Sequence, residues 1–305
     1  MPSAARLPAR RACNSASDMN RSEPFADIHC HLLPDLDDGA SGWEESLRMA
    51  ETAVADGIAT IVATPHQLGN FSKNTGAAIR AQTARFQEAL DHRGLPLRVL
   101  PGADVRIEPE LAGKLHAGEV LSLADRRRHV LLELPHGVYA PLDRLLGELQ
   151  AIGMVGILSH PERNQGILNR PDVLPRLIER GCLLQVTAAS LTGLFGTRIR
   201  RFAESIIRQG MAHFVATDAH GVASRPPLLQ DAFQRVVELA GADAAVTLCC
   251  HNPACVTNGE AVKVGVCRPS RPSWTSRFIE SLSLASVPIK QTKRVGESIP
   301  AISLD

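Results

Sequence analysis

Short hydrophobic runs recur along the chain, separated by segments in which apolar residues return every three or four positions. Several runs consist almost entirely of Val, Ile and Leu, which is typical of strands buried on both faces of a parallel sheet. We predict seven strands, at residues 25–32, 59–66, 97–105, 129–135, 154–161, 183–190 and 213–220. Helices are predicted at residues 41–57, 74–93, 142–152, 171–180, 197–209 and 227–240, the first opening with Ser41 and Glu44 in capping-box spacing.

Alternating strands and helices predict an α/β architecture, either an open doubly wound sheet or a (β/α) barrel. The position of polar residues favours the barrel. Six of the seven predicted strands end in residues of the kind that bind metal ions, within "HCH", "TPH", "GAD", "LEL", "SHPER" and "TDAH". In a barrel such ends converge on one mouth, whereas an open sheet gathers only the ends near its switch point.

The chain has 305 residues, of which 44% are hydrophobic and 21% charged, as expected for a soluble globular protein with a sizeable core. Its net charge of +1 gives no reason to expect a nucleic acid or a membrane as partner. No apolar run approaches the roughly 20 residues that span a bilayer. We therefore expect neither nucleic-acid binding nor membrane insertion.

We expect a single domain at residues 25–262 with a poorly ordered segment on each side. Residues 1–24 are basic and serine-rich and lack the apolar region of a secretory signal. A transit peptide shares that composition, and a true start at Met19 is a third interpretation. Residues 263–305 are rich in Ser, Pro and basic residues with little periodicity, which predicts a disordered tail.

The cysteines argue against both a disulfide framework and a thiol nucleophile. There are seven, an odd number, with no Cys-X-X-Cys pair, which favours a reducing and therefore cytoplasmic location. No cysteine is followed by arginine six positions later, so the phosphate loop of cysteine-dependent phosphatases is absent. Gly113-Lys114 is followed by Leu115, so there is no Walker A loop either.

Histidines and acids gather at or just after the predicted strand ends. His29 and His31 are two positions apart in one strand, so both rings point the same way, roughly 7 Å apart. The candidate metal ligands are His29, His31, Asp38, His66, Asp104, Glu133, His160, Asp218 and His220. Five imidazoles and four carboxylates exceed the needs of one ion, and this mixture without thiolates suits two or three ions of Mn²⁺, Fe or Zn²⁺.

Three acids have a simpler interpretation. Asp35 and Asp37 are expected to cap or solvate the turn before Ser41. Asp104 is either a metal ligand or a turn former before the segment "VRIEPE", and the residues alone leave both open.

Taken together, "DIHCHLLPDLDDGA", "ATPH", "LLELP", "SHPER" and "TDAHGVASRPP" resemble motifs of the PHP (polymerase and histidinol phosphatase) superfamily. The chain is most similar to the CpsB/CapC-type branch, metal-dependent protein-tyrosine phosphatases of bacterial capsule and exopolysaccharide clusters. The similarity runs in order from residue 25 to residue 262. It implies a distorted seven-stranded (β/α) barrel.

The resemblance also implies three metal positions. The first combines a bridging carboxylate with His29, His31 and Asp218. The second combines the same bridge with Glu133 and His160, and the third uses Asp38, His66 and His220. The bridge corresponds to the acid after "GA", where the family has glutamate and this chain has Asp104, one methylene shorter.

Two arginines directly follow candidate ligands. Arg163 lies three residues beyond His160, and Arg225 lies five beyond His220. The planar guanidinium group matches phosphate oxygens bidentately, and in the resembling family both positions bind phosphate. Clustered divalent ions lower the pKa of bound water, so a metal-activated hydroxide is the expected nucleophile.

The expected activity is therefore hydrolysis of phosphotyrosine on a protein, with Mn²⁺ as the first choice of metal. The resemblance implies a bacterial polysaccharide-export tyrosine kinase as partner and regulation of capsular or exopolysaccharide synthesis as the role. Alternatives are a small-molecule phosphomonoesterase such as histidinol phosphatase, a nuclease-like enzyme, or a non-catalytic metal-binding regulator. The near-neutral charge and the lack of a lysine stripe argue against nucleic acid.

Overall fold

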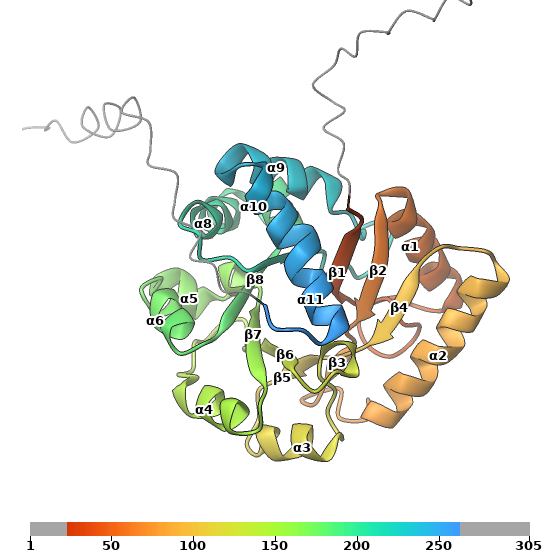
Figure 1. Ribbon diagram of the computed structural model, residues 1–305, viewed down its shortest axis with the longest axis horizontal. Coiled ribbons are helices and arrows are strands. Elements are labelled where there is room, and N and C mark those ends of the chain that lie inside the picture. Colours follow the sequence, from red (N-terminus) through yellow and green to blue (C-terminus); the bar gives the residue numbers. More distant parts are fainter. Residues whose placement is uncertain (1–22, 263–305) are drawn as a thin grey trace, which may run out of the picture. The chain divides into compact units, whose positions relative to one another are not determined.

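The structure is a computed structural model that describes residues 23–262 (Figure 1). The predictions for the two flanking segments fall almost entirely outside the described residues. Within the described part of the chain, no helix is long and apolar enough to cross a membrane.

The strands form two sheets in which every pairing of neighbours is parallel. The three-stranded sheet has the order β1 (Phe25–Cys30), β2 (Ile58–Ala63), β4 (Arg98–Pro101). The six-stranded sheet has the order β3 (His66–Gln67), β5 (Asp104–Arg106), β6 (His129–Glu133), β7 (Val155–Ser159), β8 (Leu183–Thr187), β9 (Phe214–Ala216). The predicted parallel α/β architecture is confirmed.

Two of the seven predicted strands are each divided, so the described chain has nine strands in two sheets instead of one seven-stranded sheet. The first division falls at Pro65, which has no N–H to donate to a ladder. The second falls at Gly102, where a Cβ atom would lie only 2.6 Å from Val62 Cγ1. At both points the chain leaves the small sheet and joins the large one.

The two sheets adjoin where β1 meets the end of β9. Asp218 N donates to His29 O at 2.7 Å, and His31 N donates to Ala219 O at 2.9 Å. A hydrophobic cluster inside the sheets draws on both, through Ile28, Val62, Leu131, Ile157, Leu183 and Phe214. Because this seam is also parallel, the carboxyl ends of both sheets lie on the same side of the domain.

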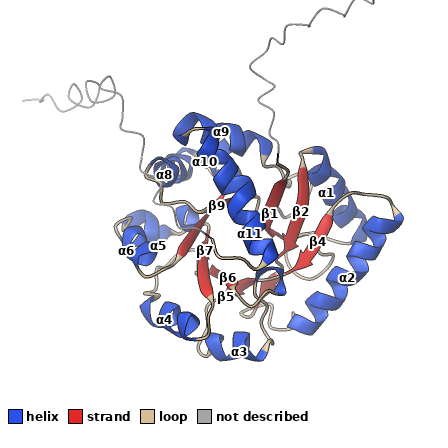
Figure 2. Cartoon of the chain, viewed as in Figure 1, coloured by secondary structure: helices blue, strands red, loops and turns tan. Residues whose placement is uncertain are grey.

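Helices surround the strands (Figure 2). They are α1 (Trp43–Ala55), α2 (Gly76–His92), α3 (Leu111–Ala117), α4 (Asp143–Ala151), α5 (Gln165–Asn169), α6 (Val173–Glu179), α7 (Ala188–Thr192), α8 (Thr197–Arg208), α9 (Gln230–Ala240), α10 (Ala242–Val246) and α11 (Asn252–Asn258). The six predicted helices correspond to α1, α2, α4, α6, α8 and α9. The others are mostly of five to seven residues, too short for a clear helical period.

The last helix, α11, was not predicted and closes the end of the strands opposite their carboxyl ends. Its Val256 packs in the inner cluster with Leu123 and Ala124, which precede β6. Asn252 Nδ2 donates to the carbonyl of His213, the residue before β9, at 2.8 Å. This helix therefore leaves the carboxyl ends of the strands free for a site.

The predicted capping box between Ser41 and Glu44 at the start of α1 is wrong, because Ser41 pairs with Glu45 instead. Ser41 donates to Glu45 Oε2 through its backbone N at 3.0 Å and its hydroxyl at 2.5 Å, and Glu44 takes no part. Gly42 is the residue that precedes the first helical turn, with φ 153°. The helix begins at Trp43, two residues after the predicted start. Ser41 therefore precedes the helix and contacts its first turn through Glu45.

Candidate metal centre

The nine predicted ligand residues converge at the carboxyl ends of the strands. His29 Nε2 lies 3.2 Å from Asp218 Oδ1, and His31 Nε2 lies 3.5 Å from the same oxygen. Across the site, His66 Nδ1 lies 3.4 Å from Asp104 Oδ2 and 3.7 Å from Glu133 Oε2.

Asp38 and the remaining histidines complete the cluster. Asp38 Oδ1 is 3.5 Å from both His66 Nε2 and His220 Nε2. The ring of His160 lies 5.7 Å from that of His29, measured between centroids. Most of these side chains are buried, while that of Asp38 is 61% exposed and faces the opening of the site.

Four overlapping groups have potential ligand atoms within 4.8 Å of one another. They are His31, Asp38, His66 and His220; His29, His31 and Asp104; His29, His160 and Asp218; and His66, Asp104 and Glu133. The group with His31 contains Asp38, His66 and His220, which together are the third metal position implied by the family resemblance. In the described residues His160 groups with Asp218 and not with Glu133, which differs from the second implied set.

The burial and hydrogen bonding of Asp104 give the clearest physical indication of a bound cation. It opens β5, so it is a strand residue, and its side chain is fully buried. Neither carboxylate oxygen has a hydrogen-bond partner in the described structure. Two unpartnered anionic oxygens in the interior are very unfavourable unless a cation binds them. The residues present therefore fit a metal ion.

His29 on β1 and His31, which directly follows this strand, point to the same conclusion. His29 Nδ1 donates to Gln185 Oε1 at 3.0 Å, and His31 Nδ1 donates to Asp37 Oδ2 at 2.7 Å. When both rings are neutral and both Nδ1 atoms act as donors, the two Nε2 lone pairs face each other at 3.3 Å. Facing lone pairs repel unless a cation lies between them, and imidazole nitrogens orient in this way when they bind metal.

The pKa shifts show how unevenly charge is distributed here. Burial opposes protonation of His31, but Asp37 and Asp218 outweigh it and raise its pKa to about 10. Burial, followed by repulsion from Asp104, raises the pKa of Glu133 to about 7. Burial and the nearby Arg163 hold the pKa of His160 well below its usual value, which keeps this ring in the neutral form. A divalent cation stabilises both the neutral imidazole and the ionised carboxylates.

The backbone around the site is held by a buried carboxylate on β1. Asp27 Oδ1 accepts from the backbone N of Thr217 at 3.0 Å and of His29 at 3.2 Å, while Oδ2 accepts from the Thr217 hydroxyl. Asp218 and His160 both have left-handed backbones, with φ of 52° and 32°. Such non-glycine conformations are uncommon and occur often at functional sites.

Sequence reasoning missed the residues that orient the ligands. Asp37 does bind the turn, accepting from Gly39 N at 2.9 Å, but its other oxygen accepts from His31 and from His66 N. Gln185 lies on β8, fully buried, and accepts from His29 Nδ1. Gln185 has no local signal, because the histidine that it orients is 156 positions away. Asp37 is only six positions from His31, but its place in a turn gave it a simpler interpretation.

Arg163 and Arg225 meet on one carboxylate. Both guanidinium groups pair with Asp218 Oδ2, and both lie over the ring of Phe195, with Cζ-to-centroid distances of 4.6 and 5.7 Å. The turn of Arg163 is fixed by its neighbour Glu162, whose Oε1 accepts from Thr187 N at 2.9 Å and from the Ser190 hydroxyl. Phe195 was not predicted as a site residue.

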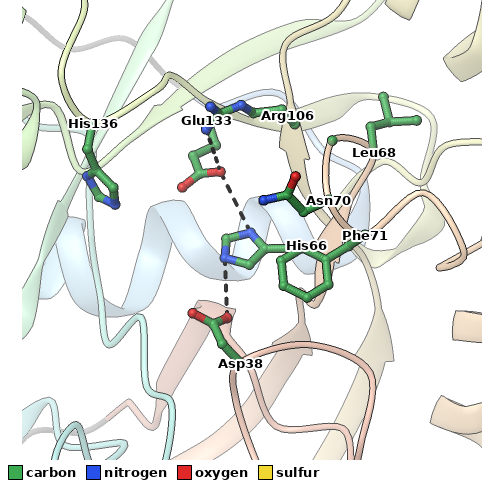
Figure 3. Close-up of a pocket in the computed structure, with 9 residues that line it drawn as sticks. Asp38, His66, Leu68, Asn70, Phe71, Arg106, Glu133 and His136 are labelled. Carbon is green, nitrogen blue, oxygen red and sulfur yellow. Dashed lines mark hydrogen bonds and ion pairs between the residues drawn. The ribbon is translucent and has the colours of Figure 1, made fainter.

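A pocket of about 280 Å³ opens beside the cluster. Figure 3 shows the His66 ring between Asp38 and Glu133, with Arg106 beside Glu133 and the ring of Phe71 against His66. Arg106 Nη1 lies 3.5 Å from Glu133 Oε2, and the Phe71 and His66 rings stack at 5.3 Å. The wall opposite is formed by His136. The cluster is therefore reached through a polar opening with one aromatic wall.

The family model for capsular polysaccharide synthesis, CpsB/CapC, matches residues 25–258. Tyrosine-protein phosphatase YwqE of Bacillus subtilis is 40% identical over 200 residues, which are 65% of this chain and 78% of that protein. Putative tyrosine-protein phosphatase CapC of Staphylococcus aureus is 33% identical over 210 residues, 68% of this chain and 82% of that protein.

Among solved structures, the chain resembles that of YwqE from Bacillus subtilis and CpsB from Streptococcus pneumoniae, described as unique metal-dependent tyrosine phosphatases. The TM-score is 0.77 at 34% sequence identity, and the match covers 81% of this chain and all of that one. The family match spans nearly the whole described domain and all nine converging residues. This chain therefore belongs to the CpsB/CapC family of capsular polysaccharide synthesis proteins.

Proposed function

We propose that this protein is a metal-dependent protein-tyrosine phosphatase. The observation that carries the proposal is the buried Asp104 carboxylate, whose oxygens have no hydrogen-bond partner. It shares the neighbour His29 with Asp218, the acid on which two arginines converge. Family membership supplies the substrate class. We also propose that the two sheets together form a distorted barrel, since one inner cluster draws on both.

We propose two or three divalent ions, with Asp104 as a ligand shared between neighbouring positions. Asp104 belongs to two of the four groups of potential ligands, one with His29 and one with Glu133. The group around Asp38 supports a separate position at the opening. Mn²⁺ is our first expectation for the metal, with Fe or Zn²⁺ as alternatives, because the ligands are oxygen and imidazole nitrogen without thiolate.

Divalent ions held by these residues would supply a water of lowered pKa as nucleophile and would neutralise charge on the phosphate oxygens. Arg163 and Arg225 both pair with Asp218 of the cluster, and we assign them to the remaining phosphate oxygens. Phe195 under both guanidinium groups limits their orientations. Because these guanidinium groups are already oriented, their charge-assisted hydrogen bonds to the phosphate oxygens strengthen as charge develops on the phosphoryl group.

The described cysteines support a mechanism without a thiol nucleophile. Cys30 lies between His29 and His31 in the sequence, but its side chain is fully buried in the main hydrophobic core. Burial raises its pKa well above the usual value, so it remains a thiol near neutral pH. Cys182 is also buried, and burial raises its pKa to about 12.

Gln185 allows a test of the ligand assignment that does not depend on turnover. Gln185→Leu removes the acceptor that fixes the His29 ring, so metal affinity is expected to fall by about 10- to 100-fold, the usual effect of losing such a partner. Metal titration by isothermal calorimetry measures it. Gln87→Leu is the matched control, because Gln87 binds only the α2–β4 region, through Val99 N and Leu97 O. Equal affinity in wild type and Gln185→Leu removes His29 from the metal site.

For the biological substrate, we propose a tyrosine-phosphorylated protein, in particular a bacterial polysaccharide-export tyrosine kinase. The support is the family name, which refers to capsular polysaccharide synthesis, and the tyrosine phosphatase names of the relatives. A cytoplasmic location remains a prediction from the cysteine pattern.

A substrate panel separates this function from the small-molecule alternative. With Mn²⁺ present, the full chain is expected to hydrolyse a phosphotyrosine peptide and p-nitrophenyl phosphate, and to act poorly on histidinol phosphate. Released phosphate measures all three. A clear preference for histidinol phosphate supports the small-molecule phosphomonoesterase instead. No turnover of any substrate, with metal bound, supports a non-catalytic regulator.

A further inference from the structure

Helix α8 carries four arginines, and within the described residues only two of them form an ion pair, both with Glu204. Arg200 Nε lies 3.1 Å from Glu204 Oε1, and Arg208 Nη2 lies 3.3 Å from Glu204 Oε2. Arg198 and Arg201 are exposed and form no ion pair within the described part of the chain. Arg198 donates instead to the amide oxygen of Asn169 at 3.0 Å. Two uncompensated guanidinium groups thus lie three positions apart at the start of one helix.

These two arginines line a groove of about 560 Å³ between α8 and the α5–α6 segment. Leu168, Pro171 and Phe202 give it an apolar part, and Thr197 and Ser205 add hydroxyl groups. Figures 1 and 2 both show α5, α6 and α8 as neighbours on one side of the domain. No acidic residue lines the groove, so it presents positive charge beside an apolar surface.

The segments that form the groove directly follow the residues around the proposed phosphate-binding Arg163. Helix α5 begins two residues after Arg163, at Gln165. Helix α8 begins two residues after Phe195, the ring over which Arg163 lies at 4.6 Å. Both walls of the groove therefore start from the segments that hold the Arg163 guanidinium. We therefore expect a polypeptide whose phosphotyrosine reaches Arg163 to place its neighbouring residues near this groove.

We propose that the groove binds an acidic segment of the phosphoprotein adjacent to the phosphotyrosine. Carboxylate side chains pair with Arg198 and Arg201, and an apolar side chain of the same segment packs on Leu168 and Phe202. The inference rests on the proposed phosphotyrosine phosphatase function. Charge complementarity selects the occupant, because two exposed guanidinium groups without an acidic partner in the described residues favour an anionic ligand and disfavour a basic one.

The test compares two phosphotyrosine peptides that differ only in their flanks, one with glutamates and one with glutamines. For the full chain with Mn²⁺, kcat/KM is expected to favour the glutamate peptide by about 10-fold, mostly through KM, and the preference should weaken at high salt. In Arg198→Glu/Arg201→Glu the ratio is expected to fall to one or below. Dividing each value by turnover of p-nitrophenyl phosphate corrects for any change at the metal centre.

Arg48→Glu/Arg93→Glu is the matched control, because it makes the same change in net charge at exposed residues of α1 and at the end of α2. This variant is expected to keep the full preference. Absence of a preference in the wild type, or its retention in Arg198→Glu/Arg201→Glu, overturns the proposal. Fluorescence anisotropy of the same labelled peptides separates the two hypotheses: if no phosphotyrosine is hydrolysed but the glutamate peptide still binds through these arginines, only the phosphatase assignment fails.

Discussion

Replacing Asp104 with alanine is expected to remove at least one equivalent of tightly bound metal ion and most of the phosphatase activity. The carboxylate is fully buried, it has no other partner, and its Oδ2 lies 3.6 Å from His29 Nε2 and 3.4 Å from His66 Nδ1. Asp104 belongs to two groups of potential ligands, and its carboxylate would neutralise part of the charge of the ions held there, so its loss would weaken their binding. Elemental analysis of the folded variant measures the metal content.

Two further variants sharpen this experiment. Asp104→Glu is expected to retain metal and activity, because it restores the longer side chain that the family resemblance implies. Asp56→Ala is a control, since Asp56 Oδ2 accepts from Gln230 N at 3.0 Å, at the start of α9, so that its loss lowers stability without touching a candidate ligand. If folded Asp104→Ala carries as much metal as the wild type, Asp104 is not a ligand.

Replacing either arginine with alanine is expected to lower kcat/KM on a phosphotyrosine peptide by about 10- to 100-fold. A charge-assisted hydrogen bond contributes roughly 1.5–3 kcal/mol, and each 1.4 kcal/mol corresponds to a factor of about ten in rate. Arg163 and Arg225 are partly buried and both pair with Asp218, one of the candidate metal ligands. We therefore expect them to contact the phosphate oxygens, on which negative charge develops during the reaction. The metal content is expected to stay unchanged in both variants.

Two controls distinguish this role from a general loss of positive charge. Arg180→Ala removes an exposed arginine that pairs with Asp143 at 3.4 Å, and it is expected to have no effect on turnover. Arg163→Lys keeps the charge but loses the planar fork, so it is expected to recover only part of the activity. Full kcat/KM in both Arg163→Ala and Arg225→Ala contradicts the assignment to phosphate.

Much of the site was predictable because parallel strands place their carboxyl ends together. His29 and His31 at the end of β1, and Asp218 after β9, needed only the strand pattern and their spacing. Only the structure shows that β1 lies beside the end of β9, which brings these residues together. The alternative interpretation of Asp104 as a turn former is not supported, since this residue opens β5 and pairs with His66 and Leu131.

Other features depend on contacts between distant segments, and no local pattern reveals them. Gln185 is 156 positions from the histidine that it orients. Phe195 follows a short helix in a segment without clear periodicity, yet it packs under two arginines from other loops. The division of two predicted strands also escaped detection, because their hydrophobic pattern continues through Pro65 and Gly102.

Removal and return of metal is the measurement that tests a metal-dependent tyrosine phosphatase most directly. The full chain is treated with a chelator until elemental analysis finds no divalent ion, and hydrolysis of a phosphotyrosine peptide is followed before and after addition of Mn²⁺. Activity is expected to vanish with the metal and to return with Mn²⁺, while thiol alkylation leaves it largely intact. Full activity in metal-free protein, together with inactivation by alkylation, contradicts the metal mechanism.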